Sequence, residues 1–259
     1  MVVVMNKEKL LEELLIKLDE SIVLPDTYEK KVSLWEDYVI QNNRYDISDD
    51  VLLIEDKYLR LDLLNRPLTD AEALDTIDIS NKSGNKYANK IALWNGDITV
   101  LYVDGIVCPT TKSVLGTFDI DSRSLDKYIH IRSGMRLRIK CNLIMEGTEL
   151  SKTEAIVTRS FNLPADCIIH SVVEDIKNDK DLREAYNNVL ECAKNNLIKT
   201  LAIPLLGKDL GIMDGLEEFK MAVACTLDFL EKYDKFFTKI IFVLDHMDYD
   251  VMQEVVGDI

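Results

Sequence analysis

The sequence predicts an α/β domain that is preceded by an all-helical segment. Apolar residues in the first part of the chain recur at helical spacing, whereas the later part contains short apolar runs rich in β-branched residues. Two strongly periodic helical stretches, residues 181–196 and 216–233, alternate with the later runs. Strands that alternate with helices are typical of βαβ units built on a buried sheet.

Three helices are expected in the first part. In residues 7–18 the spacing of the leucines predicts an amphipathic helix, and a second helix is expected over residues 28–41. A third begins after Ser48, a residue type that suits an N-cap, and runs towards Pro67. We therefore expect a helical extension over residues 1–75.

A polar, turn-rich stretch at residues 76–90 marks the domain boundary, and we expect an α/β domain over residues 76–259. Six apolar runs in that domain are candidate strands. They are residues 91–94, 97–107, 155–157, 167–173, 200–206 and 239–244.

The composition excludes several classes of protein. The chain has 259 residues, of which 47% are hydrophobic, so it can bury a full core. Its net charge of −15, without a concentrated basic stripe, argues against a nucleic-acid partner. The five cysteines are widely spread without a CxxC pair, which favours reduced thiols and a cytoplasmic location. The opening MVVVM is too short for a signal sequence, and no apolar run is long enough for a membrane span.

The most informative motif is Gly96-Asp97-Ile98-Thr99, which is followed by the apolar run 103–107. A carboxylate just after a glycine turn can accept a hydrogen bond from an adenine amino group, and the next backbone N–H can serve a ring nitrogen. Asp97 and Ile98 are therefore candidate base-binding residues. The alternative interpretation is a simple turn, because turns also favour Gly and Asp.

These segments resemble the opening of the macrodomain family, and the similarity continues through residues 114–116, 125–134, 161–164 and 168–171. In the helical part, Leu34-Trp35, Ile47-Ser48 and residues 56–59 resemble the N-terminal extension of the zinc-containing macrodomains of bacteria and fungi. The resemblance implies a three-layer α/β/α fold with a mixed central sheet. It also implies a cleft for ADP-ribose, with ADP-ribose or an ADP-ribosylated protein as partner.

The chain departs from the zinc subtype at the metal site. Thr117, Ser122 and Ser124 stand where the resemblance places the zinc ligands, and a hydroxyl is a poor zinc ligand. We therefore expect no metal cofactor. Asp119, Asp121 and Asp126 could suggest a hard-cation site, but they lack the spacing of a calcium loop, so a solvated acidic loop is preferred.

The catalytic loop differs as well. The family has Asn-Ala-Ala-Asn where this chain has Cys108-Pro109-Thr110-Thr111. Both amides are replaced, and Pro109 removes a backbone donor. We assign no catalytic residue here, interpret Cys108 as an inert buried thiol, and keep Thr111 as a candidate ligand-binding residue.

The loop that would hold a diphosphate keeps glycine, which backbone anion sites require. Its candidate ligand-binding residues are Gly207, Lys208, Leu210 and Gly211. Asp209 would oppose a phosphate, and Asp245 stands where relatives often place an aromatic residue against the base.

The three histidines fit structural roles better than catalytic ones. His130 and His170 occupy positions where the family has histidine outside its chemistry, and His246 is expected alone in a loop.

Three functions remain open at this point. The preferred one is a module that binds ADP-ribose or a related adenine nucleotide without turnover. The alternatives are a protein-ADP-ribosyl hydrolase with a rearranged site and an interaction scaffold that binds no nucleotide.

Overall fold

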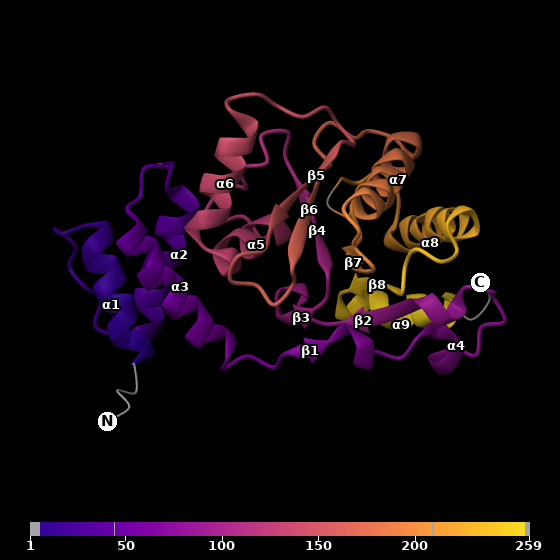
Figure 1. The fold of residues 1–259 in the computed structure, drawn as a ribbon, viewed down its shortest axis with the longest axis horizontal. Coiled ribbons are helices and arrows are strands. Elements are labelled where there is room, and N and C mark those ends of the chain that lie inside the picture. The colour runs from indigo at the N-terminus through magenta and orange to yellow at the C-terminus, as the bar shows by residue number, and fades with distance from the viewer. Residues whose placement is uncertain (1–5, 44, 209, 257–259) are drawn as a thin grey trace.

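The computed structural model describes residues 6–43, 45–208 and 210–256 (Figure 1). Its first part is a bundle of three helices: α1 (Lys7–Leu18), α2 (Tyr28–Gln41) and α3 (Asp49–Leu63). Their leucines and aromatic residues form one buried cluster around Trp35 and Tyr58, whose rings meet edge to face with centroids 5.1 Å apart. The three predicted helices are confirmed, although Ser48 makes no capping hydrogen bond with its side chain.

A six-stranded sheet forms the centre of the second part. Its strands lie in the order β2 (Ile91–Asn95), β8 (Lys239–Leu244), β7 (Thr200–Pro204), β4 (Gly105–Thr110), β6 (Cys167–Val172) and β5 (Ala155–Arg159). All neighbouring pairs are parallel except β5 with β6, so the sheet is mixed. Two short strands, β1 (Thr69–Asp70) and β3 (Leu101–Tyr102), pair separately.

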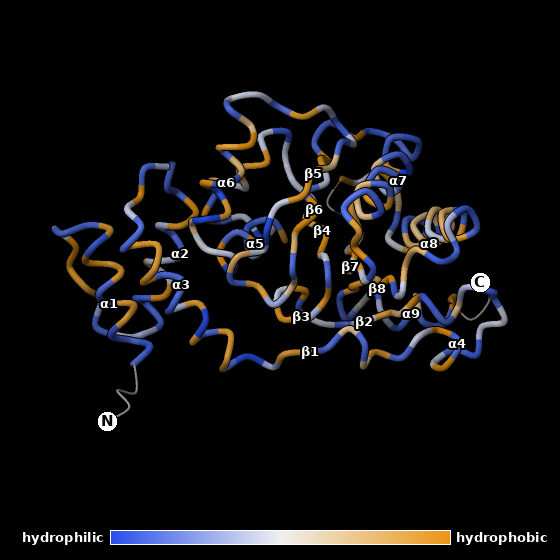
Figure 2. Tube along the Cα trace, in the orientation of Figure 1, coloured by the Kyte–Doolittle hydropathy of each residue, from blue (hydrophilic) through white to orange (hydrophobic). Residues whose placement is uncertain are grey.

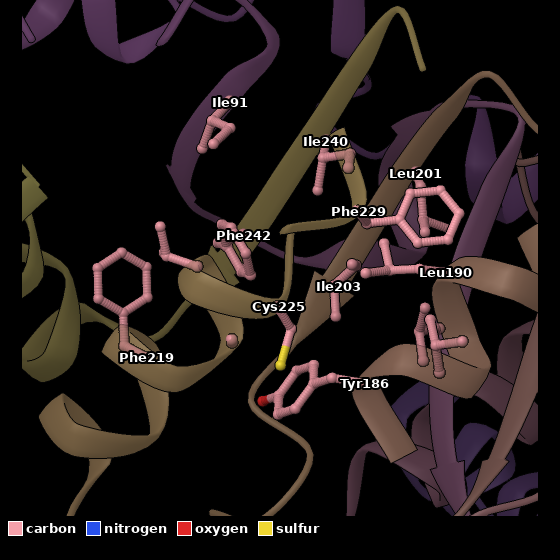
Figure 3. Packing of buried hydrophobic residues seen from close by; sticks show 14 of the residues in the cluster. Ile91, Tyr186, Leu190, Leu201, Ile203, Phe219, Cys225, Phe229, Ile240 and Phe242 are labelled. Carbon is pink, nitrogen blue, oxygen red and sulfur yellow. The ribbon is translucent and has the colours of Figure 1, made fainter. Parts of the chain in front are cut away.

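Helices cover both faces of the sheet, which gives the expected three layers (Figure 1). On one face lie α5 (Leu125–Ser133) and α6 (Met135–Met145); on the other lie α7 (Asp179–Asn195), α8 (Gly215–Lys232) and α9 (His246–Val256). The hydrophobic core between the sheet and helices α7, α8 and α9 contains Tyr186 of α7, Phe219 of α8 and Phe242 of β8 (Figure 3). Hydrophobic stretches run along β4, β6 and β7 in the trace, as expected for a sheet buried on both sides (Figure 2).

The structure corrects the predicted strand at residues 97–107. Asp97 instead begins a 3-10 turn, Ile98–Val100, because its carboxylate accepts a hydrogen bond from the Thr99 N–H. Asp104 then separates β3 from β4, since its carboxylate accepts hydrogen bonds from the N–H groups of Lys199 and Thr200, both at 2.8 Å. The predicted strand is therefore divided where Asp97 and Asp104 accept hydrogen bonds from backbone N–H groups, which hydrophobic periodicity does not reveal.

His246 and the turn-rich stretch also differ from expectation. His246 begins α9 rather than lying in a loop. The stretch 76–90 contains the short helix α4 (Ile77–Ser80) and a 3-10 turn at Ala88–Lys90, and a further 3-10 turn at Ala71–Ala73 precedes it. The Lys239 ammonium donates to the carbonyls of Ala71 and Leu74 at 3.0 and 2.8 Å, so residues ahead of the predicted boundary already pack on the α/β part.

Two buried polar groups connect the helical bundle to the sheet domain. Arg138 of α6 donates from Nη1 to the carbonyls of Val39, Ile40 and Asn42 at the end of α2, at 2.6, 2.8 and 3.1 Å. Its Nε and Nη2 reach the carbonyls of Leu115 and Thr117 at 2.7 and 2.9 Å. One guanidinium thus caps a helix of the extension and holds a loop of the sheet domain.

Glu55 of α3 forms the second connection. Its buried carboxylate accepts hydrogen bonds from Trp35 Nε1 at 3.1 Å and from the Met135 N–H, the first of α6, at 2.7 Å. Burial raises the pKa of Glu55 from 4.5 to about 7.

Within the described part of the chain, no helix combines the length and apolarity that crossing a bilayer requires.

Candidate ligand-binding cleft

A cleft of about 910 Å³ opens at the carboxyl edge of the parallel strands. The segments that leave this edge line it. They are Gly96–Thr99 after β2, Thr111 after β4, Val173 and Glu174 after β6, Leu205 and Leu206 after β7, and Asp245 after β8. This is the position where open α/β sheets bind ligands.

Asp97 and Ile98 lie on one wall of this cleft. Asp97 Oδ1 accepts hydrogen bonds from the Thr99 N–H at 2.9 Å and the Thr99 hydroxyl at 2.6 Å. Its Oδ2 forms an ion pair with Arg66 Nη2, and the same nitrogen donates to Thr99 Oγ1 at 3.0 Å. Arg66 comes from the segment that follows α3. The helical extension therefore supplies a side chain to the cleft.

Lys208 also lines the cleft. Its ammonium contacts the Asp245 carboxylate and lies 3.0 Å from Asp248 Oδ2. The hydrogen bond from Lys208 lowers the pKa of Asp245 below its ordinary value. Lys208 and Leu210 both line the cleft, and the lysine ammonium already contacts two carboxylates.

The two predicted glycines do not line the cleft. The Gly207 N–H donates to Glu218 Oε1 of α8 at 2.6 Å, and the Leu206 N–H donates to the Tyr186 hydroxyl at 3.0 Å. Both donors thus point into the core. Gly211 has a φ of 64°, a conformation that favours glycine, but it also lies outside the cleft lining. Asp209 lies outside the described residues.

Asp126 corrects the expectation of a solvated acidic loop. It lies buried in the first turn of α5, where Oδ2 accepts a hydrogen bond from the Thr117 N–H at 2.8 Å. Its Oδ1 accepts from Cys108 Sγ at 3.3 Å. Burial raises the pKa of Asp126, and burial next to this carboxylate raises the pKa of the Cys108 thiol well above its ordinary value. Cys108 is therefore protonated, which supports its interpretation as inert.

The positions of the expected zinc ligands also lie at the cleft. Thr117, Ser122 and Ser124 line it together, and the Ser122 hydroxyl donates to Ser124 Oγ at 2.9 Å. The Ser124 side chain caps α5 by accepting from the Lys127 N–H. Among the described residues, no three His, Cys, Asp or Glu side chains gather as metal ligands.

The two buried histidines stand behind the cleft wall. His170 Nε2 lies 2.8 Å from the Thr158 hydroxyl, and burial lowers its pKa to about 3. His130 Nε2 lies 3.7 Å from Asp126 Oδ1, and burial lowers its pKa well below 6.5. Neither side chain lines the cleft, so the geometry supports structural roles for both.

The fold is that of a macrodomain. Residues 109–217 match the family model described as Macro domain. The Trypanosoma brucei macrodomain in complex with ADP-ribose superposes with a TM-score of 0.65 at 19% identity, covering 95% of each chain. The Oceanobacillus iheyensis macrodomain with MES bound gives 0.57 at 25% identity, over 67% of this chain and 94% of its own.

Curated relatives extend the similarity into the helical extension. A protein-ADP-ribose hydrolase of Staphylococcus aureus (strain MSSA476) is 27% identical over 248 residues, which cover 91% of this chain and 88% of the relative. A protein of the same name from Treponema medium is 27% identical over 219 residues, 82% of each chain.

Proposed function

We propose that the cleft binds ADP-ribose or a related adenine nucleotide. The observation that carries this proposal is the placement of Asp97 and Ile98 together on the wall of a cleft of about 910 Å³, a volume in the usual range for small-ligand sites. Asp97 Oδ2 retains acceptor capacity for a base amino group, because a carboxylate oxygen accepts more than one hydrogen bond. The solved macrodomain with bound ADP-ribose supports this choice of ligand.

We further propose that the chain is a divergent member of the zinc-containing subtype and binds without hydrolysis. Thr117, Ser122 and Ser124 supply hydroxyls where that subtype is expected to hold zinc. Cys108, which stands in place of the first of the two amides, is protonated and donates a hydrogen bond to Asp126. The competing function is a hydrolase, which is favoured by the names and 27% identity of the curated relatives.

Calorimetric titration with ADP-ribose tests binding. We expect measurable binding to the wild-type chain and about tenfold weaker binding to Asp97→Ala, the usual effect of losing one polar contact to a ligand. The matched control is Asp121→Ala, which removes the same charge from an exposed position outside the cleft lining. Equal affinity of the two variants, or no heat with wild type, would reject the proposed site.

A hydrolase assay separates binding from turnover. Automodified protein carrying ADP-ribose is incubated with the chain, with and without added zinc, and released ADP-ribose is measured. We expect no release above the buffer control. Release by the wild-type chain that Asp97→Ala abolishes would establish the hydrolase function instead.

A further inference from the structure

The part of the cleft that contains Asp97 also contains a side chain from the helical extension, Arg66. Arg66 follows α3 and precedes Pro67, and its side chain is 20% exposed where it meets Asp97, which is 50% exposed. Among the described residues, Arg66 is the only cationic side chain that pairs with Asp97. Both residues line the cleft.

The two oxygens of Asp97 have different partners. Oδ1 accepts both donors of Thr99, which fix the orientation of the carboxylate. Oδ2 is the oxygen left for a ligand, and this is the oxygen that Arg66 contacts. Arg66 is thus not needed to orient Asp97, and it competes with a ligand for the same acceptor.

We propose that Arg66 is an internal competitor for the base-recognition carboxylate, so that the helical extension limits the affinity of the cleft. The proposal rests on the proposed function, because it requires that Asp97 receive a base amino group. A ligand that reaches Asp97 must share Oδ2 with the guanidinium or displace it. A half-exposed ion pair of this kind is worth up to about fivefold in an equilibrium constant.

A double-mutant cycle with ADP-ribose tests the competition. We expect Arg66→Ala to bind ADP-ribose about fivefold more tightly than wild type. Asp97→Ala should then lower the affinity for ADP-ribose about fiftyfold in the Arg66→Ala background, against about tenfold in wild type. Arg66→Gln repeats the cycle with less loss of packing, and thermal unfolding of each variant verifies that it folds.

The matched control for lost charge is Arg123→Ala. Arg123 also lines the cleft but forms no ion pair with any residue that the structure describes, so its removal takes away a cation without releasing Asp97. This control should not tighten binding. Its effect gives the contribution of charge alone, since ADP-ribose is an anion.

The size of the coupling decides the outcome. If Asp97→Ala lowers the affinity for ADP-ribose by the same factor in both backgrounds, Arg66 does not compete for Asp97, even if ADP-ribose binds. Binding by none of the variants, all of them folded, rejects the proposed function and the competition together.

Discussion

Replacing Arg138 by methionine should weaken the attachment of the helical extension to the sheet domain and so destabilise the fold. Arg138 is 5% exposed, and its guanidinium donates to five backbone carbonyls that belong to two separate segments, the end of α2 and the loop at residues 115–117. Methionine keeps most of the buried stem but supplies no donor. Each buried carbonyl left without a partner costs about 1–3 kcal/mol, although water and local relaxation recover part of this loss.

We therefore expect Arg138→Met to lower the free energy of unfolding by about 3–5 kcal/mol, the range for breaking a buried network that contains a charge. Urea unfolding followed by circular dichroism measures the change, and Lys140→Met, at an exposed position of the same helix, is the control. A loss below about 1 kcal/mol would refute the reasoning, because the five carbonyls would then have other partners.

Two further predictions concern buried groups. The folded pKa of Glu55, about 7, lies above its ordinary value of 4.5, so the folded chain retains a proton that the unfolded chain loses between these pH values. Its contribution to the free energy of unfolding therefore decreases as pH rises through this window, by up to about 3 kcal/mol. The two buried histidines change the free energy of unfolding with pH in the opposite direction. The quantity to measure is therefore the difference in the free energy of unfolding between wild type and Glu55→Gln, from urea unfolding at pH 5 and at pH 8. If the difference between wild type and Glu55→Gln is the same at pH 5 and pH 8, the raised pKa of Glu55 is wrong. Gly207→Ala should lower stability by about 1–3 kcal/mol, because a Cβ there would lie 2.7 Å from Leu182 Cδ2, and thermal unfolding should show no comparable loss for Gly84→Ala, which has nothing within 4 Å.

Regular periodicity made much of the fold predictable. Residues 28–41 form a helix with the predicted bounds, and the expected helix at 181–196 is Asp179–Asn195. Strand positions also followed from apolar runs, because a sheet covered on both faces needs continuous hydrophobic segments. The predicted run 97–107 failed where Asp97 and Asp104 bind nearby backbone N–H groups, an effect that hydropathy does not record.

The candidate site was predictable only where residues leave adjacent parallel strands. Asp97 and Lys208 line the cleft because each follows a strand at its carboxyl end. No local pattern marks Arg66, since its partner is 31 positions away and its approach depends on how the extension docks. The sequence also does not predict the placement of Gly207, because its N–H donates to Glu218 of α8 in the core. The boundary between residues 75 and 76 stays a prediction.

The apolar core of the extension also has a consequence for folding. That core is completed by Ile131 of α5 and Met135 of α6, so the extension and the sheet domain share one hydrophobic cluster. Neither part can bury its apolar surface fully when the other is absent, and Glu55 would lose its partner on α6 at the same time. The two parts should therefore fold as one cooperative unit, with a single transition, and a fragment that lacks the first three helices would expose the inner surfaces of α5 and α6 to association.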